Sequence, residues 1–314
     1  MFLKKNVGLL NFNSLTMKTI KHISFIIMVF TSAFFTACNS DSSSTTENMA
    51  DSLETDSVSI DEQMPDLVFQ VPAPDELFAL IKNSGCKFKD NLMNSEKSVY
   101  ESKTAQELNL GIYAADLAYL AAFEKFQPSL KYFGKVKSMS DQMGLSTAIG
   151  NETYSRLENN IANADSLLDI TNNSYYSVVQ KLEESGNGKT LALIMSGGWI
   201  ESMYIATNLV GAYSEKDPNI QRIASQKITF NNLILNLEKY KDQPEVGEQL
   251  AKFVNLKAIY DKVIKETLEQ NTVSKIDTSS VVIGQKSKYI FTKEMFESFS
   301  KEINNLRNLI IKMS

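Results

Sequence analysis

The sequence predicts an all-α protein, a single array of about seven to nine mostly antiparallel helices around one apolar central helix. Its 314 residues include only six Pro and 13 Gly, so residues that break helices are scarce. Residues 189–213 are apolar on nearly every side, which is typical of a helix enclosed by others. The other helical stretches are amphipathic and closely spaced, and short connections favour antiparallel neighbours.

Residues 1–37 have the pattern of a bacterial signal peptide. A basic stretch beginning at Met17, the expected true start, precedes the apolar run 23–35. That run is too short to span a membrane and suits the hydrophobic region of a signal peptide. The small residues before Cys38 resemble the lipobox of bacterial lipoproteins, so we expect Cys38 to be acylated and to begin the mature chain. The alternative is an ordinary secretory signal that happens to contain a cysteine.

Residues 38–66 differ sharply in composition from the rest of the chain. They are rich in Ser and Thr and carry eight acidic residues without Lys or Arg. Such a segment cannot bury enough apolar surface to fold. We therefore expect a disordered acidic tether that joins the lipidated cysteine to a helical domain over 67–314.

The net negative charge and the scarcity of histidine and cysteine exclude several kinds of binding and catalytic site. From Cys38 on, 28 basic residues stand against 37 acidic ones and no histidine remains, so we expect no nucleic-acid partner. Without histidine, Ser-His-Asp and Cys-His catalysis and histidine-bearing zinc or haem sites are excluded. Cys86 is the one cysteine left besides Cys38, which leaves no disulfide framework. We expect neither a metal nor a cofactor.

The helices are expected in the following order, from their periodicity and their end signals. They cover 75–83, 108–126, 128–143, 151–185, 189–213, 218–240, 244–268 and the segment after Thr292. Thr104 and Glu107 have the spacing of a capping box, Asp217 precedes a proline as an N-cap does, and 171–174 looks like a break. Residues 279–291 have strand-like content and predict either a small hairpin or a long loop.

The central helix carries its polar residues on one side. Gly197, Gly198, Glu201 and Asn208 fall together at 3.6 residues per turn, and Glu201 leans over the gap left by the two glycines. Two glycines cost about 1 kcal/mol each inside a helix. We therefore expect the gap to be used, either by another backbone that packs closely or by a bound group.

Two acidic residues fall on faces that should be buried, Asp116 and Glu201. A buried unpaired carboxylate costs several kcal/mol, so each needs a partner. One interpretation is an ion pair to Arg156 or Arg307, completed by tyrosine hydroxyls. The others are a ligand cleft with Trp199 as a stacking wall, a hard-cation site with oxygen ligands, or a carboxylate pair for acid–base chemistry.

The two acidic stretches resemble each other. Residues 116–121 and 201–206 share the pattern acid-x-x-Tyr-aliphatic-Ala, with Tyr119 and Tyr204 one turn after the acid. Tyr113 lies one turn before Asp116. If the likeness is meaningful, the two helices should pack together at the glycine gap and direct both polar units at one interior point.

The sequences Gly-Ile-Tyr-Ala-Ala-Asp-Leu-Ala-Tyr at 111–119 and Gly-Gly-Trp-Ile-Glu-Ser-Met-Tyr-Ile-Ala-Thr at 197–207 resemble a family of uncharacterised helical lipoproteins from the Bacteroidota. The resemblance implies an envelope location, in the outer membrane, and no known activity. We expect a membrane-anchored, non-enzymatic lipoprotein that binds a small ligand or an envelope partner. The alternative is a hydrolase or lyase that uses Asp116 and Glu201, which an open cleft at both acids would favour.

Overall fold

The computed structural model describes residues 74–95, 99–160, 163–267 and 287–313. The expected signal peptide, the acylated Cys38, the tether and the first residues of the domain lie outside this part of the chain. Within it the all-α prediction is confirmed. The helices are α1 (Asp75–Asn83), the short 3₁₀ helix η1 (Asp90–Leu92), α2 (Lys103–Ala122), α3 (Phe126–Gln142), α4 (Asn151–Asn160), α5 (Ala164–Glu184), α6 (Gly188–Val210), α7 (Pro218–Ser225), α8 (Lys227–Glu238), α9 (Pro244–Asp261) and α10 (Lys293–Ile311).

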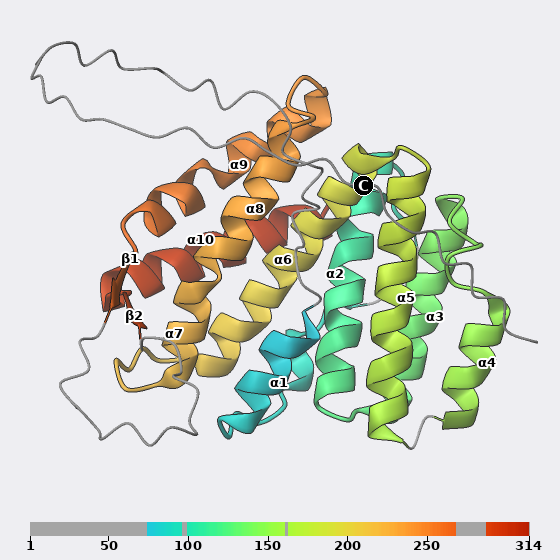
Figure 1. Ribbon diagram of the computed structural model, residues 1–314, viewed down its shortest axis with the longest axis horizontal. Helices are drawn as coiled ribbons and strands as arrows, with labels where there is room; N and C mark the ends of the chain where they lie inside the picture. The colour runs from blue at the N-terminus through green and yellow to red at the C-terminus, as the bar shows by residue number, and fades with distance from the viewer. Residues whose placement is uncertain (1–73, 96–98, 161–162, 268–286, 314) are drawn as a thin grey trace, which may run out of the picture. The chain divides into compact units, whose positions relative to one another are not determined.

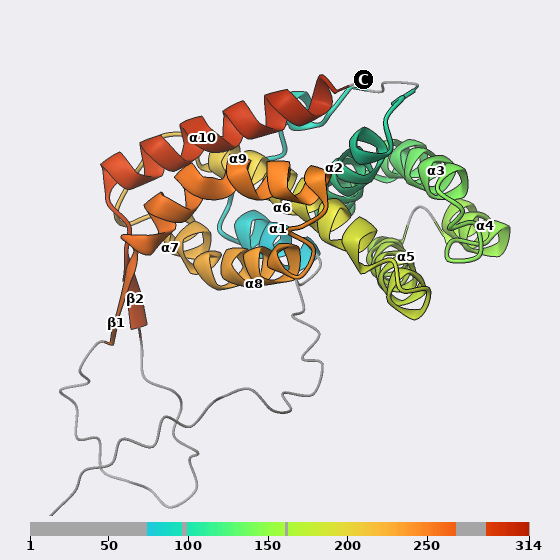
Figure 2. The same ribbon diagram turned by 90° about the horizontal axis from the view of Figure 1, so that it is seen from above.

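Helix α6 occupies the centre, as its composition predicted. It packs along α2 over much of its length, and α10, α8 and α5 also lie against it (Figure 1). Helices α3 and α5 pack on α2, while α8 and α9 pack on each other. Seen from above, α10 lies on one side of α6 and α8 on the other (Figure 2). A helix with neighbours on every side must be apolar on every side, which explains the unbroken run in the sequence.

Helices α2 and α6 cross with their backbones in contact. A Cβ atom added at Gly197 would lie 1.9 Å from the carbonyl oxygen of Leu108, and one at Gly111 would lie 2.0 Å from that of Ile194. Real Cβ atoms do not approach backbone atoms so closely. The gap at Gly197 and Gly198 is thus filled by the backbone of α2, which was one of the two expected uses.

The expected capping box at the start of α2 is wrong. Ser102 is the N-cap, and its hydroxyl accepts a hydrogen bond from the Ala105 amide at 3.3 Å. Thr104 lies inside the first turn. Glu107 does not reach back to the cap, because it is buried against α6 and accepts a hydrogen bond from the Thr190 hydroxyl at 2.6 Å.

Two other expected boundaries also move. Residues 171–174 do not break a helix, because the hydroxyls of Thr171 and Ser174 donate to carbonyls one turn back inside α5. The chain instead leaves helix between α4 and α5, where Asn163 caps α5. Asp217 is an N-cap as predicted, but the helix it starts ends at Ser225, and α8 begins at Lys227.

The hairpin differs from the expected one. Strand β1 (Ile264–Thr267) pairs antiparallel with β2 (Ser287–Ile290), and Ile264 lies opposite Ile290. The second strand falls within the expected 279–291, whereas residues 279–284 lie outside the described part of the chain. Helix α9 ends at Asp261, short of the expected 268, and Val254 and Ile264 have 62% and 59% of their surfaces exposed.

Candidate functional site

Glu201 and Arg307 form a buried ion pair between α6 and α10. The guanidinium donates through Nε to Oε2 at 2.9 Å and through Nη2 to Oε1 at 3.1 Å. The ring of Tyr204 lies 4.2 Å from the guanidinium carbon, one turn along α6. This two-point contact satisfies both carboxylate oxygens of Glu201, which is fully buried.

Asp116 lies beside this pair and competes with Glu201 for one cation. Its Oδ2 accepts a hydrogen bond from the backbone amide of Asn94 at 3.0 Å. Complete burial, followed by the negative charge of Glu201, raises the pKa of Asp116 well above its usual range. Burial raises the pKa of Glu201 as well, but the charge and hydrogen bonds of Arg307, followed by the contact with the Asp116 carboxyl, lower it in part. The cluster therefore favours a proton on Asp116 and an ionised Glu201 beside Arg307.

The polar side chains of the 111–119 stretch share one partner, the backbone of the segment that follows α1. Tyr113 donates to the carbonyl of Ser95 at 3.0 Å, and Asp116 binds the Asn94 amide. The hydroxyl of Tyr119 accepts from the amide of Lys89 at 2.8 Å and donates to its carbonyl at 3.3 Å. Burial raises the pKa of Tyr119 to about 12, which keeps this hydroxyl protonated.

Two further side chains hold the same segment from other helices. Arg307 on α10 donates to the carbonyl of Leu92 at 3.3 Å, and Tyr132 on α3 donates to that of Asn94 at 2.7 Å. Buried backbone groups outside helices must find partners, and here side chains from three helices supply them. These side chains of α2, α3 and α10 thus hold residues 89–95, which include η1, against the helices.

Three of the expected site residues, Arg156, Asn208 and Trp199, form no hydrogen bond or ion pair with Asp116, Glu201 or Arg307. Arg156 lies 3.8 Å from Asp169 on the surface, so the alternative ion pair to Arg156 is wrong. Asn208 is half-buried and donates its amide to the Tyr204 carbonyl on its own helix. The Trp199 ring packs in an aromatic group, 4.8 Å from Phe230, on the side of α6 away from Glu201. It therefore forms no wall beside the acids.

Both acids are sealed from solvent. Asp116 and Glu201 have 0% of their surfaces exposed, and Arg307 has 7%. A substrate cannot reach either carboxyl while the segment around Asn94 stays in place. Of the expected arrangements, the geometry fits a structural ion-pair cluster best.

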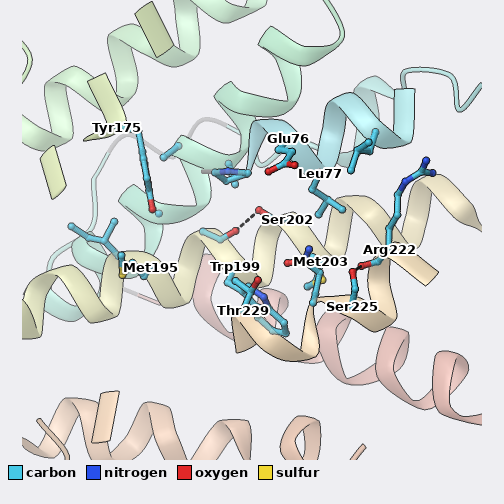
Figure 3. A pocket seen from close by; sticks show the side chains of 18 residues that line it. Glu76, Leu77, Tyr175, Met195, Trp199, Ser202, Met203, Arg222, Ser225 and Thr229 are labelled. Carbon is cyan, nitrogen blue, oxygen red and sulfur yellow. Dashed lines mark hydrogen bonds between the residues drawn. The ribbon is translucent and has the colours of Figure 1, made fainter. Parts of the chain in front are cut away.

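A cavity of about 230 Å³ lies beside the α2–α6 crossing, and neither Asp116 nor Glu201 lines it. Its lining includes four small residues of α2 and α6: Gly111, Ala114, Ala115 and Gly198. Its walls come from α1, α5, α6, α7 and α8, and Figure 3 shows Leu77, Trp199 and Met203 among them. The polar residues in its lining are Glu76, Tyr175, Ser202, Arg222, Ser225, Gln226 and Thr229.

A second cavity of about 40 Å³ adjoins the first and is almost entirely apolar. The two share Pro74, Ala114, Tyr175, Ile194 and Met195 in their linings. Of the expected site residues, Gly198 and Trp199 line the larger cavity. Sequence reasoning missed the other lining residues, although small residues on α2 opposite the glycines of α6 are a signal that could have indicated a hollow.

Among the described residues no group of three or more His, Cys, Asp or Glu side chains is placed to hold a metal ion. None of the helices described is long and apolar enough to cross a membrane. The chain matches no protein-family model, no curated protein and no solved structure. The resemblance to helical lipoproteins therefore stays a prediction from the sequence.

Proposed function

We propose that the chain is a lipid-anchored protein of the bacterial envelope whose helical domain binds a small ligand in the cavity beside the α2–α6 crossing. The observation that carries this proposal is the cavity itself. Ligand sites are concave, mostly apolar and supplied with a few polar groups, and this cavity has that composition. Its volume suits a molecule of roughly ten to fifteen non-hydrogen atoms.

Binding is favoured over catalysis because the two candidate catalytic acids serve the fold. Asp116 and Glu201 are fully buried, and the Glu201 carboxylate is occupied by Arg307. A general acid or base must lie within hydrogen-bond reach of its substrate. The hydrolase or lyase alternative would need a movement that uncovers both carboxyls.

The ligand-binding proposal can be tested by filling the cavity. Ala114 lines both cavities and is half-buried, so Ala114→Leu places a larger side chain in them. Ala258→Leu makes the same change on the exposed side of α9. Both variants and the parent chain would be purified from native membranes, and small molecules extracted from them would be identified by mass spectrometry.

We expect a compound that accompanies the parent chain and the Ala258→Leu variant and is absent from Ala114→Leu. Unchanged helical content by circular dichroism would show that Ala114→Leu still folds. An identical set of small molecules from all three proteins would contradict the proposal.

The anchoring proposal has its own test. Cys38→Ala should release the protein from the membrane fraction or leave an uncleaved precursor, because acylation at this cysteine would both mark the cleavage site and hold the chain. Normal processing with unchanged membrane fractionation would end the lipoprotein interpretation.

A further inference from the structure

Three polar groups of the larger cavity, on Glu76, Ser202 and Ser225, can offer only hydrogen-bond acceptors. The hydroxyl of Ser202 donates its proton to the Gly198 carbonyl at 2.7 Å, and that of Ser225 donates to the Arg222 carbonyl at 2.8 Å. Each hydroxyl has one proton, so both oxygens present only lone pairs to anything in the cavity. Glu76 adds a carboxylate, which also accepts.

The carboxylate of Glu76, which is exposed, takes part in no hydrogen bond or ion pair with the described residues. Figure 3 shows it on the side of α1 that faces Ser202. Its neighbour Asp75 is engaged, since it accepts a hydrogen bond from the Asn172 amide at 2.7 Å. A carboxylate at the edge of an apolar cavity places negative potential where a ligand enters.

The one cation in the lining is turned away from this acid. Arg222 donates through Nη1 to Oδ1 of Asn219 at 2.5 Å, and the Asn219 amide in turn donates to Ser84 at 2.8 Å. In Figure 3 the guanidinium stands at the far end of its side chain, away from Trp199. The aliphatic part of Arg222 therefore supplies wall, while its charge belongs to the network between α7 and the end of α1.

The rest of the wall suits an apolar group next to a positive charge. Trp199 and Tyr175 supply aromatic rings, and Met195 and Met203 supply polarisable sulfur atoms. Aromatic faces attract cations through their quadrupole, and thioethers adapt to irregular apolar shapes. Thr229 and Gln226 can donate or accept, so they admit such a ligand without selecting it.

We propose that the cavity takes an apolar molecule bearing a protonated amine, with the ammonium group beside Glu76 and Ser202 and the apolar body against Trp199 and Met203. This inference rests on the proposed ligand-binding function and adds the chemical class of the ligand. An ammonium group brings three donors to a set of acceptors, whereas a carboxylate would face lone pairs and the charge of Glu76.

Three probes of matched shape separate the charge from the apolar body: 2-phenylethylamine, 2-phenylethanol and 3-phenylpropionate. The full chain in non-ionic detergent would be titrated with each at low salt, and binding followed by the fluorescence of Trp199, the one tryptophan of the chain. The variants are Glu76→Gln and, as a matched control, Asp75→Asn, which removes the same charge one residue away. Uptake of the amine by micelles is the same for every variant, so it cancels in the comparison.

We expect the amine to bind most tightly, Glu76→Gln to weaken it by about threefold to tenfold, and Asp75→Asn to change it by less than about twofold. The alcohol should be insensitive to Glu76→Gln. Equal or tighter binding of the propionate, or amine binding that Glu76→Gln leaves unchanged, would overturn the amine proposal. The proposed function would survive that result if Ala114→Leu, titrated alongside, still abolished binding. Failure of all three probes to bind would instead overturn the proposed function.

Discussion

Replacing Asp116 with asparagine tests where the proton of the buried cluster resides. Asparagine has nearly the shape of a protonated aspartic acid, so its amide can donate to Glu201 while its oxygen accepts from the Asn94 amide. The variant thereby fixes permanently the hydrogen-bond pattern that the raised pKa of Asp116 favours. It also removes the carboxyl that competes with Glu201 for Arg307.

The size of the effect follows from proton linkage. The unfolded chain loses the Asp116 proton near pH 3.9, whereas the folded chain keeps it until the higher folded pKa is reached. Between those two values the folded state binds one more proton, so the free energy of unfolding of the parent chain falls by about 1.4 kcal/mol per pH unit from this group. Below the unfolded pKa the contribution is fully present. The Asp116→Asn variant lacks this term.

The free energy of unfolding of Asp116→Asn minus that of the parent should therefore rise with pH. The increase between pH 4 and pH 6 is about 2 kcal/mol while the folded carboxyl retains its proton. Urea denaturation at pH 4, 5 and 6 measures this difference. Glu201→Gln is the contrasting variant, with an expected loss of about 3 kcal/mol, because it leaves the buried Arg307 without its carboxylate. A difference that is flat or falls with pH would refute the assignment of the proton to Asp116.

The remaining predictions concern the helix crossing and the start of α2. Gly111→Ala should destabilise the domain by about 3 kcal/mol or more, because its Cβ would meet the Ile194 carbonyl. Gly134→Ala in α3 is the control and should be neutral or stabilising by up to about 1 kcal/mol. Thermal unfolding compares the two variants, and equal midpoints would contradict the close contact between α2 and α6. Ser102→Ala should cost about 1 kcal/mol by removing the N-cap of α2, and Thr104→Ala less than about 0.5 kcal/mol; the opposite ranking would restore the capping box.

The sequence could predict which residues share a face of one helix, because helical periodicity alone decides this. Periodicity placed Gly197 and Glu201 on one face of α6, and the energetic cost of a buried acid pointed to an arginine, which the structure supplies as Arg307. The 171–174 run misled, because the residue types that favour turns can also bond back within a helix, as Thr171 does.

The partners of the polar side chains were not readable, because most are backbone groups. The Tyr119 hydroxyl binds the backbone amide and carbonyl of Lys89, and the side-chain type of residue 89 does not predict this contact. The cavity was also beyond sequence reasoning, since its existence depends on how α1 lies over small residues of α2 and α6. Gly111 lines the cavity and also touches α6 at the crossing, but a single glycine in an apolar helix has many explanations and does not predict either role.

The backbone contact between α2 and α6 has a consequence for mutational tolerance. Every missense change of a glycine codon introduces a Cβ atom, and at Gly111 and Gly197 that atom would fall within 2.0 Å of a carbonyl oxygen on the opposing helix. At Gly198 the nearest atom is 3.3 Å away, so a small shift can accommodate alanine. In a saturation library selected for folded protein, codons 111 and 197 should thus be recovered only as glycine, while codon 198 should also return alanine.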